Sequence, residues 1–124
     1  MKLKQVIDVA AALSAIATAK LPAKASYRVA KAINLLRPEV TTFEEQRIKL
    51  AKELGTLSEG GMSYTFDGDS AAKFQAQLTE LLEEECNVVI PTVTPDDLGT
   101  AEIEPQHLIA LDGAFIKEIV NEAQ

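Results

Sequence analysis

The sequence is poor in the residue types that metal, redox and nucleophilic sites require. Its 124 residues include one cysteine, one histidine and no tryptophan, and aromatic residues make up 5% of the chain. A single cysteine excludes a disulfide framework within the chain and a cysteine-rich zinc site. The sequence also lacks a glycine-rich phosphate loop, a paired-histidine motif and a dinucleotide fingerprint. We therefore predict a non-enzymatic protein without catalytic residues, metal or cofactor.

Acidic residues are scarce in the N-terminal part of the chain, and basic residues are scarce in the rest. Residues 1–54 contain 10 Lys and Arg against 5 Asp and Glu, whereas residues 55–124 contain 2 against 14. This uneven distribution favours docking of one part of the chain on the other, or of one copy on another. The net charge of −7 repels a polyanion, so we disfavour nucleic acid as a partner.

Long apolar runs are missing as well. The mostly apolar run near the N-terminus, Val9–Ala19, has 11 residues, whereas a membrane span needs about 20. Together with the basic Met1–Lys4, this run has the outline of a secretory signal peptide. Asp8 interrupts that outline and most of the run is alanine. We predict a packed helix in a cytoplasmic protein that has no membrane association.

Helical periodicity dominates the first 54 residues. Apolar residues recur at helical spacing over residues 3–17 and again over residues 25–54. Leu21-Pro22 separates the two stretches, because the residue before a proline is driven away from the helical conformation. The pattern predicts an antiparallel helical hairpin over residues 1–54.

Pro38 lies inside the second stretch, where a proline removes one helical hydrogen bond. We predict a long helix that is kinked near Pro38; the alternative is a break, with Thr42 capping a new helix and Glu45 completing a capping box.

An unbroken helix over Pro22–Leu54 is about 50 Å long, more than the width of a compact domain of this size. Such a helix exposes apolar side chains unless a partner covers it. This is our main reason to expect a homo-oligomer.

Residues 55–124 predict a strand-helix-strand-helix part of the same single domain. The expected elements are a strand around Met62–Phe66, a helix capped by Asp69 and reaching Leu82, a β-branched edge strand over Val88–Val93 and a capped turn at Thr94–Asp97. A C-terminal helix is expected from Pro105, with an interruption at Asp112-Gly113 and a continuation through Phe115, Ile116 and Ile119. Cys86 closes an apolar helix, and we expect it in the core. The predicted class is α+β, mostly helical, with a small sheet.

Cations gather on one face at the start of the second helix. Lys24, Arg28 and Lys31 occupy positions i, i+4 and i+7, Lys20 precedes them and Tyr27 is adjacent. This cationic face can bind an anion such as phosphate or a nucleotide, helped by the positive N-terminal end of the helix. The alternative is a solvated face or one that is paired with acids of the protein itself.

Three acids gather at the end of the third helix. Glu83, Glu84 and Glu85 lie where the helix macrodipole disfavours negative charge, and they also repel one another. A nearby counter-charge would relieve both costs. We expect the cationic face, in the same chain or in a neighbouring copy, to supply it, so that Glu83–Glu85 form its acidic counter-face.

Three motifs are spread over most of the chain. They are LPxKxSYxxAK at Leu21–Lys31, FEExR at Phe43–Arg47 and LLEEE at Leu81–Glu85, with a looser match over Ile103–Leu111. In this pattern the chain resembles a group of small bacteriophage and prophage proteins. That group has no established activity, so the resemblance implies a phage context and the roles that small phage proteins commonly fill.

Two hypotheses about function follow. The first is a homo-oligomeric phage protein that acts by binding itself or other phage proteins, as a virion or assembly component. The second is an anti-defence or host-takeover protein that sequesters an anionic small molecule, such as a nucleotide signal, at the cationic face. Either protein would be located in the host cytoplasm or the virion. Pairing of the cations with Glu83–Glu85 would favour the first hypothesis, and unpaired cations in an intersubunit cleft with Tyr27 would favour the second.

Overall fold

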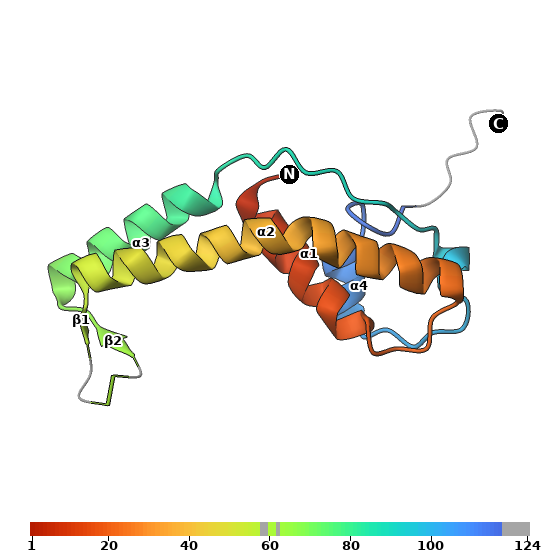
Figure 1. Cartoon of the computed structure of the whole chain (residues 1–124), viewed down its shortest axis with the longest axis horizontal. Helices are drawn as coiled ribbons and strands as arrows, with labels where there is room; N and C mark the ends of the chain where they lie inside the picture. The colour runs from red at the N-terminus through yellow and green to blue at the C-terminus, as the bar shows by residue number, and fades with distance from the viewer. Residues whose placement is uncertain (58–59, 62, 118–124) are drawn as a thin grey trace.

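The computed structural model describes residues 1–57, 60–61 and 63–117. In chain order its elements are the helices α1 (Leu3–Ile16) and α2 (Ala23–Leu54), the strands β1 (Thr56–Leu57) and β2 (Tyr64–Thr65), helix α3 (Gly68–Leu82), the 3₁₀ helix η1 (Pro95–Leu98) and helix α4 (Pro105–Leu111). The predicted class is confirmed: the protein is mostly helical α+β with a small sheet (Figure 1).

Helix α2 is the axis on which the other elements are arranged (Figure 1). It has 32 residues and runs without interruption through Pro38, which gives a length of about 48 Å. The alternative of a break with a new cap at Thr42 is wrong, since Thr42 lies inside the helix. Leu36 before Pro38 and Phe43 after it are both buried, and this packing offsets the helical hydrogen bond that is lost at Pro38.

The first half of α2 belongs to a packed body together with α1, η1 and α4. Helix α1 packs against α2 on one side and against α4 on another (Figure 1), which confirms the predicted N-terminal helix pair. Small side chains, among them Ala25 and Ala32, are completely buried on α2 and let the helices approach closely. The largest completely buried side chains of the body are Val6, Val9, Leu13, Val29, Leu36, Val93, Leu111 and Phe115.

The second half of α2 leaves this body and forms an arm (Figure 1). We call "the arm" residues 43–54 of α2 with the β1–β2 hairpin and α3, which runs back along α2 in the opposite direction. Helix α3 has no buried residue. At the base of the hairpin the Phe66 ring stacks on Phe74, with 4.6 Å between the ring centroids. The arm is therefore two helices and a hairpin without a third layer.

The sheet consists of the two strands of this hairpin. β1 and β2 are antiparallel, with Thr56 opposite Thr65 and Leu57 opposite Tyr64. The strand predicted around Met62–Phe66 is confirmed at Tyr64 and Thr65, and Met62 lies outside the described residues.

The second predicted strand is wrong. Val88–Val93 forms no strand but an extended segment that leads from α3 to η1. Within the described residues this segment forms one isolated β-bridge, between Val93 and Ile116. In this bridge the Val93 N–H donates to the carbonyl of Phe115 over 2.8 Å. A β-branched composition suits a strand, but a strand forms only where a neighbour offers a hydrogen-bonding edge. Here Pro91 also lacks an N–H group.

Two helix boundaries differ from those predicted. The cap of α3 is Asp67 rather than Asp69, because the Asp67 carboxylate accepts the Ser70 N–H over 2.9 Å. Helix α4 begins at Pro105 and ends at Leu111, which confirms the predicted interruption at Asp112-Gly113, but no helix continues through Phe115 and Ile116. Gly113 takes a φ of 79°, a conformation that ends helices. Ile119 lies outside the described residues.

Enlarging a buried alanine on α2 tests the close packing of the body. Ala32 is 0% exposed, so we expect Ala32→Leu to lower the free energy of unfolding by about 1–3 kcal/mol. The matched control is Ala30→Leu, at an exposed position of the same helix, which should change it by less than about 0.5 kcal/mol. Urea denaturation followed by circular dichroism measures both. Equal midpoints for the two variants would contradict the packing.

Candidate functional site

The start of the cationic face is paired within the chain. Lys24 Nζ lies 3.6 Å from Asp97 Oδ1, and Arg28 Nη1 lies 3.8 Å from Asp97 Oδ2. Arg28 Nη1 also donates a hydrogen bond of 2.9 Å to the backbone carbonyl of Thr92. These contacts fasten η1 and the segment before it to the first turns of α2. Internal pairing was one of the two alternatives for this face, and its acid is Asp97.

The Asp97 carboxylate is held in place by the predicted capped turn. Its Oδ2 accepts the Thr94 N–H over 2.9 Å, and the Asp97 N–H donates to Thr94 Oγ1 over 3.3 Å, which completes a capping box. The hydrogen bond from the Thr94 backbone and then the charges of Lys24 and Arg28 hold the pKa of Asp97 below its usual value, against the opposing effect of burial. The carboxylate therefore stays charged and ready to pair with both cations.

The remaining residues of the cationic face take no part in the contacts with Asp97. Lys31 Nζ lies 6.0 Å from the centroid of the Tyr27 ring, and Tyr27 is 65% exposed. Lys20 and Lys31 are exposed, and neither makes an ion pair within the part of the chain that the structure describes. An anion bound to Lys24 and Arg28 would lie close to the Asp97 carboxylate, which repels it.

The acidic end of α3 is neutralised by the N-terminus instead of the cationic face. Glu83 pairs with Lys2, and the amino group of Met1 lies 3.4 Å from Glu85 Oε1. The Leu3 N–H donates to the carbonyl of Glu84 over 2.8 Å. The hydrogen bond and the charge of Glu83 raise the pKa of Lys2, and Lys2 lowers the pKa of Glu83 in the same way.

Within one chain, then, the expected pairing of the cationic face with Glu83–Glu85 is wrong. The physical reason is position: the cationic face lies on the first turns of α2 beside η1, and the acids lie beside the start of α1. The basic Met1–Lys4 segment was the sequence signal for the observed pairing, since it is another cluster of positive charge in the first 54 residues. Pairing with the cations of a neighbouring copy stays a prediction.

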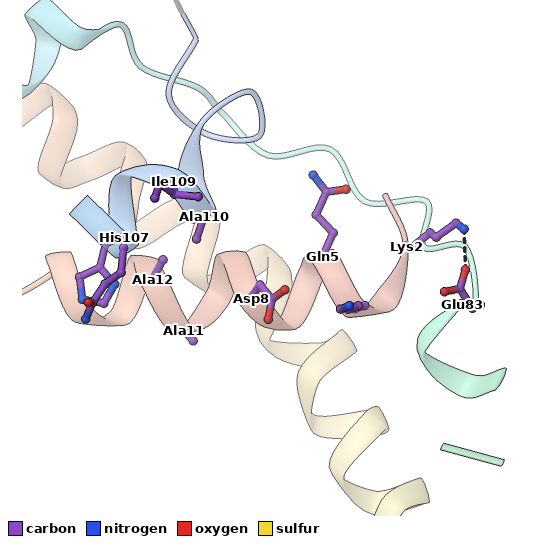
Figure 2. A pocket seen from close by; sticks show the side chains of 11 residues that line it. Lys2, Gln5, Asp8, Ala11, Ala12, Glu83, His107, Ile109 and Ala110 are labelled. Atoms are coloured by element: carbon purple, nitrogen blue, oxygen red, sulfur yellow. Dashed lines mark hydrogen bonds and ion pairs between the residues drawn. The ribbon is translucent and has the colours of Figure 1, made fainter. Parts of the chain in front are cut away.

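A groove of about 590 Å³ lies between α1 and α4 (Figure 2). Its lining combines small apolar side chains, among them Ala11, Ala12 and Ala110, with the strongly exposed Ile109. Figure 2 shows the Lys2–Glu83 pair at one end of the groove and His107 toward the other. The groove thus runs from the charged pair at one end, past Asp8, to small apolar side chains and His107 (Figure 2).

The groove does not assemble a reactive set of side chains. His107 Nε2 lies 3.9 Å from Glu104 Oε2, and Lys2 and Glu83 are already paired with each other. Among the residues that the structure describes, no group of three or more His, Cys, Asp and Glu side chains could hold a metal ion. The arrangement suits contact with an apolar surface better than proton transfer or metal chemistry.

Comparison with known proteins adds no relative. No protein-family model, no curated protein and no solved structure matches this chain. None of the described helices is long and apolar enough to cross a membrane. The assignment of a function therefore depends on the contacts and charges of the chain itself.

Removing the charge of Asp97 tests the link between η1 and α2. The pKa of Asp97 is lower in the folded protein than in the unfolded chain. The charged carboxylate therefore stabilises the fold above the unfolded pKa of about 3.9, and this contribution is lost as the pH falls through the folded pKa. We expect Asp97→Asn, which keeps a hydrogen-bond acceptor, to be less stable than the wild type near pH 7 and equally stable at acidic pH. Thermal unfolding across this pH range measures the difference. Asp96→Asn, at the exposed neighbour, is the control, and the same pH dependence in both variants would refute the link.

Cys86 is buried, as expected. Burial first, and the nearby Glu39 carboxylate second, raise the pKa of the Cys86 thiol. Because the thiolate is the reacting form, Ellman's reagent should react with the native protein much more slowly than with the urea-unfolded chain. Absorbance of the released thiol measures both rates. Equal rates would show that Cys86 is accessible and outside the core.

Proposed function

We propose that the chain is a non-enzymatic, homo-oligomeric phage protein that acts by binding, as a virion or assembly component. The observation that carries this proposal is the arm, in which α3 has no buried residue. Apolar side chains there stay in contact with water, Ile48 on α2 and Leu57 on β1 among them. A second protein surface would remove them from water, which is favourable in proportion to the apolar area buried.

Binding through surfaces requires no metal, and the described residues include no group of three or more His, Cys, Asp and Glu side chains that could hold one. The phage context comes from the motif resemblance at Leu21–Lys31, Phe43–Arg47 and Leu81–Glu85. Virion and assembly proteins are built largely from repeated contacts between copies of one chain. A long helix that extends beyond its own body is well suited to such contacts.

Sequestration of an anionic small molecule is the second candidate. The residues that support it are Lys20 and Lys31, which make no ion pair within the described residues, and the exposed Tyr27. The Asp97 carboxylate beside Lys24 and Arg28 weighs against it, because that charge repels an anion and already satisfies both cations. We therefore place binding between protein copies first.

Native mass spectrometry of the protein purified from phage-infected cells, without a denaturing step, tests the proposed function. We expect a defined homo-oligomer whose mass is an integer multiple of 13.4 kDa. Antibody detection in purified particles then distinguishes a virion component from an assembly factor that is left behind.

Two results would overturn this proposal. A monomer at every concentration tested would remove the oligomer. Extra mass of nucleotide size, retained by the wild type and lost in Arg28→Glu, would move the function to sequestration at the cationic face. Lys73→Glu, which makes the same change of charge at an exposed position of α3, is the control for that variant.

A further inference from the structure

The charged residues of α2 between positions 39 and 52 fall into two blocks of opposite sign. Over residues 39–45 the charged side chains are Glu39, Glu44 and Glu45, with no cation. Over residues 46–52 they are Arg47, Lys49 and Lys52, with no acid. The stretch is therefore negative in its first half and positive in its second, with the change at Gln46.

Part of this charge is already used within the chain. The Arg47 guanidinium pairs with Glu44 one turn earlier, with 2.7 Å between Nη2 and Oε2. Glu45 and Lys52 are exposed and make no ion pair with any described residue. They are seven residues apart on α2, so they share one face of the helix at a separation of about 10.5 Å, too far to pair with each other.

Ile48 lies between these two charges along the helix and is 42% exposed. It borders a groove of about 470 Å³ that is lined by the apolar Ala51, Phe66 and Phe74 and by the polar Arg47, Ser63 and Tyr64. This groove lies where α2 meets the hairpin and α3, at the end of the arm farthest from the body (Figure 1). The surface thus has an apolar centre with an unpaired acid on one side and an unpaired cation on the other.

We propose that this surface is the interface of a two-fold symmetric dimer, in which the α2 helices of two copies cross antiparallel beside Ile48. In that alignment Glu45 of each chain lies opposite Lys52 of the partner subunit, so the same ion pair forms twice around the axis. The two apolar centres meet between the ion pairs. A parallel alignment would place acid against acid and cation against cation, which is unfavourable.

A second copy is the occupant because the surface is complementary to itself. A two-fold interface requires that one patch contain both halves of every contact, and Glu45, Ile48 and Lys52 meet this requirement on a single helix face. The assignment presupposes the homo-oligomer proposed above and names the part of the chain that forms it.

Charge reversal tests this interface without disturbing the core. Glu45→Lys and Lys52→Glu each replace two attractive contacts by two repulsive ones, so each purified variant should dissociate with a Kd at least about tenfold higher than the wild type. An equimolar mixture of the two variants should restore the dimer as a heterodimer, since every contact is then attractive. Analytical ultracentrifugation of the full-length proteins, with one variant fluorescently labelled, measures self-association and mixing.

The control is Glu53→Lys, which makes the same change of charge on the same helix. Glu53 lines a different groove, on the side of the arm with Gln46, Gln77 and Leu81, and its reversal should leave the dimer unchanged. A wild-type oligomer that persists in both single variants would overturn this interface and leave the proposed homo-oligomer standing. A wild-type monomer would overturn both. Recovery in the mixture also shows that both variants are folded.

Discussion

The mismatch between the length of α2 and the amount of chain available to cover it shapes this protein. A helix of 32 residues is about 48 Å long, and the elements that pack around its first half use most of the other apolar residues. Only α3 and a two-strand hairpin are left for the second half. The packed body and the arm with its exposed apolar side chains are two results of the same constraint.

Charge pairing ties together parts of the body that are far apart in the sequence. Asp97 joins η1 to Lys24 and Arg28 at the start of α2, and the N-terminal residues hold the end of α3 through Glu83 and Glu85. The exposed pairs contribute little stability individually, but they fix where η1 and the segment after α3 lie. Among the described residues, Glu45 and Lys52 of the arm stay outside these pairs, as do Lys20 and Lys31 of the cationic face.

Elements that are determined by residues close together in the sequence could be predicted from the sequence. Periodicity predicted α1 and α2, and the Thr94–Asp97 turn was recognisable because its capping residues are adjacent. The strand predicted at Val88–Val93 failed because a strand needs a neighbour that composition does not reveal. The spacing of Lys24 and Arg28 predicted that they share one helix face, but the sequence did not reveal Asp97 as their acid, since Asp97 reaches Arg28 only after η1 has docked.

The position of α1 between α2 and α4 has a consequence for synthesis of the chain. The hairpin of α1 and α2 can form as soon as residue 54 has left the ribosome, because its contacts are close in sequence. The face of α1 that packs on α4 must wait until Leu111 has been made. During that interval the nascent chain carries an uncovered apolar face, of the kind that general chaperones bind. Translation speed between α2 and α4 thus sets how long the unfinished chain is open to misassembly.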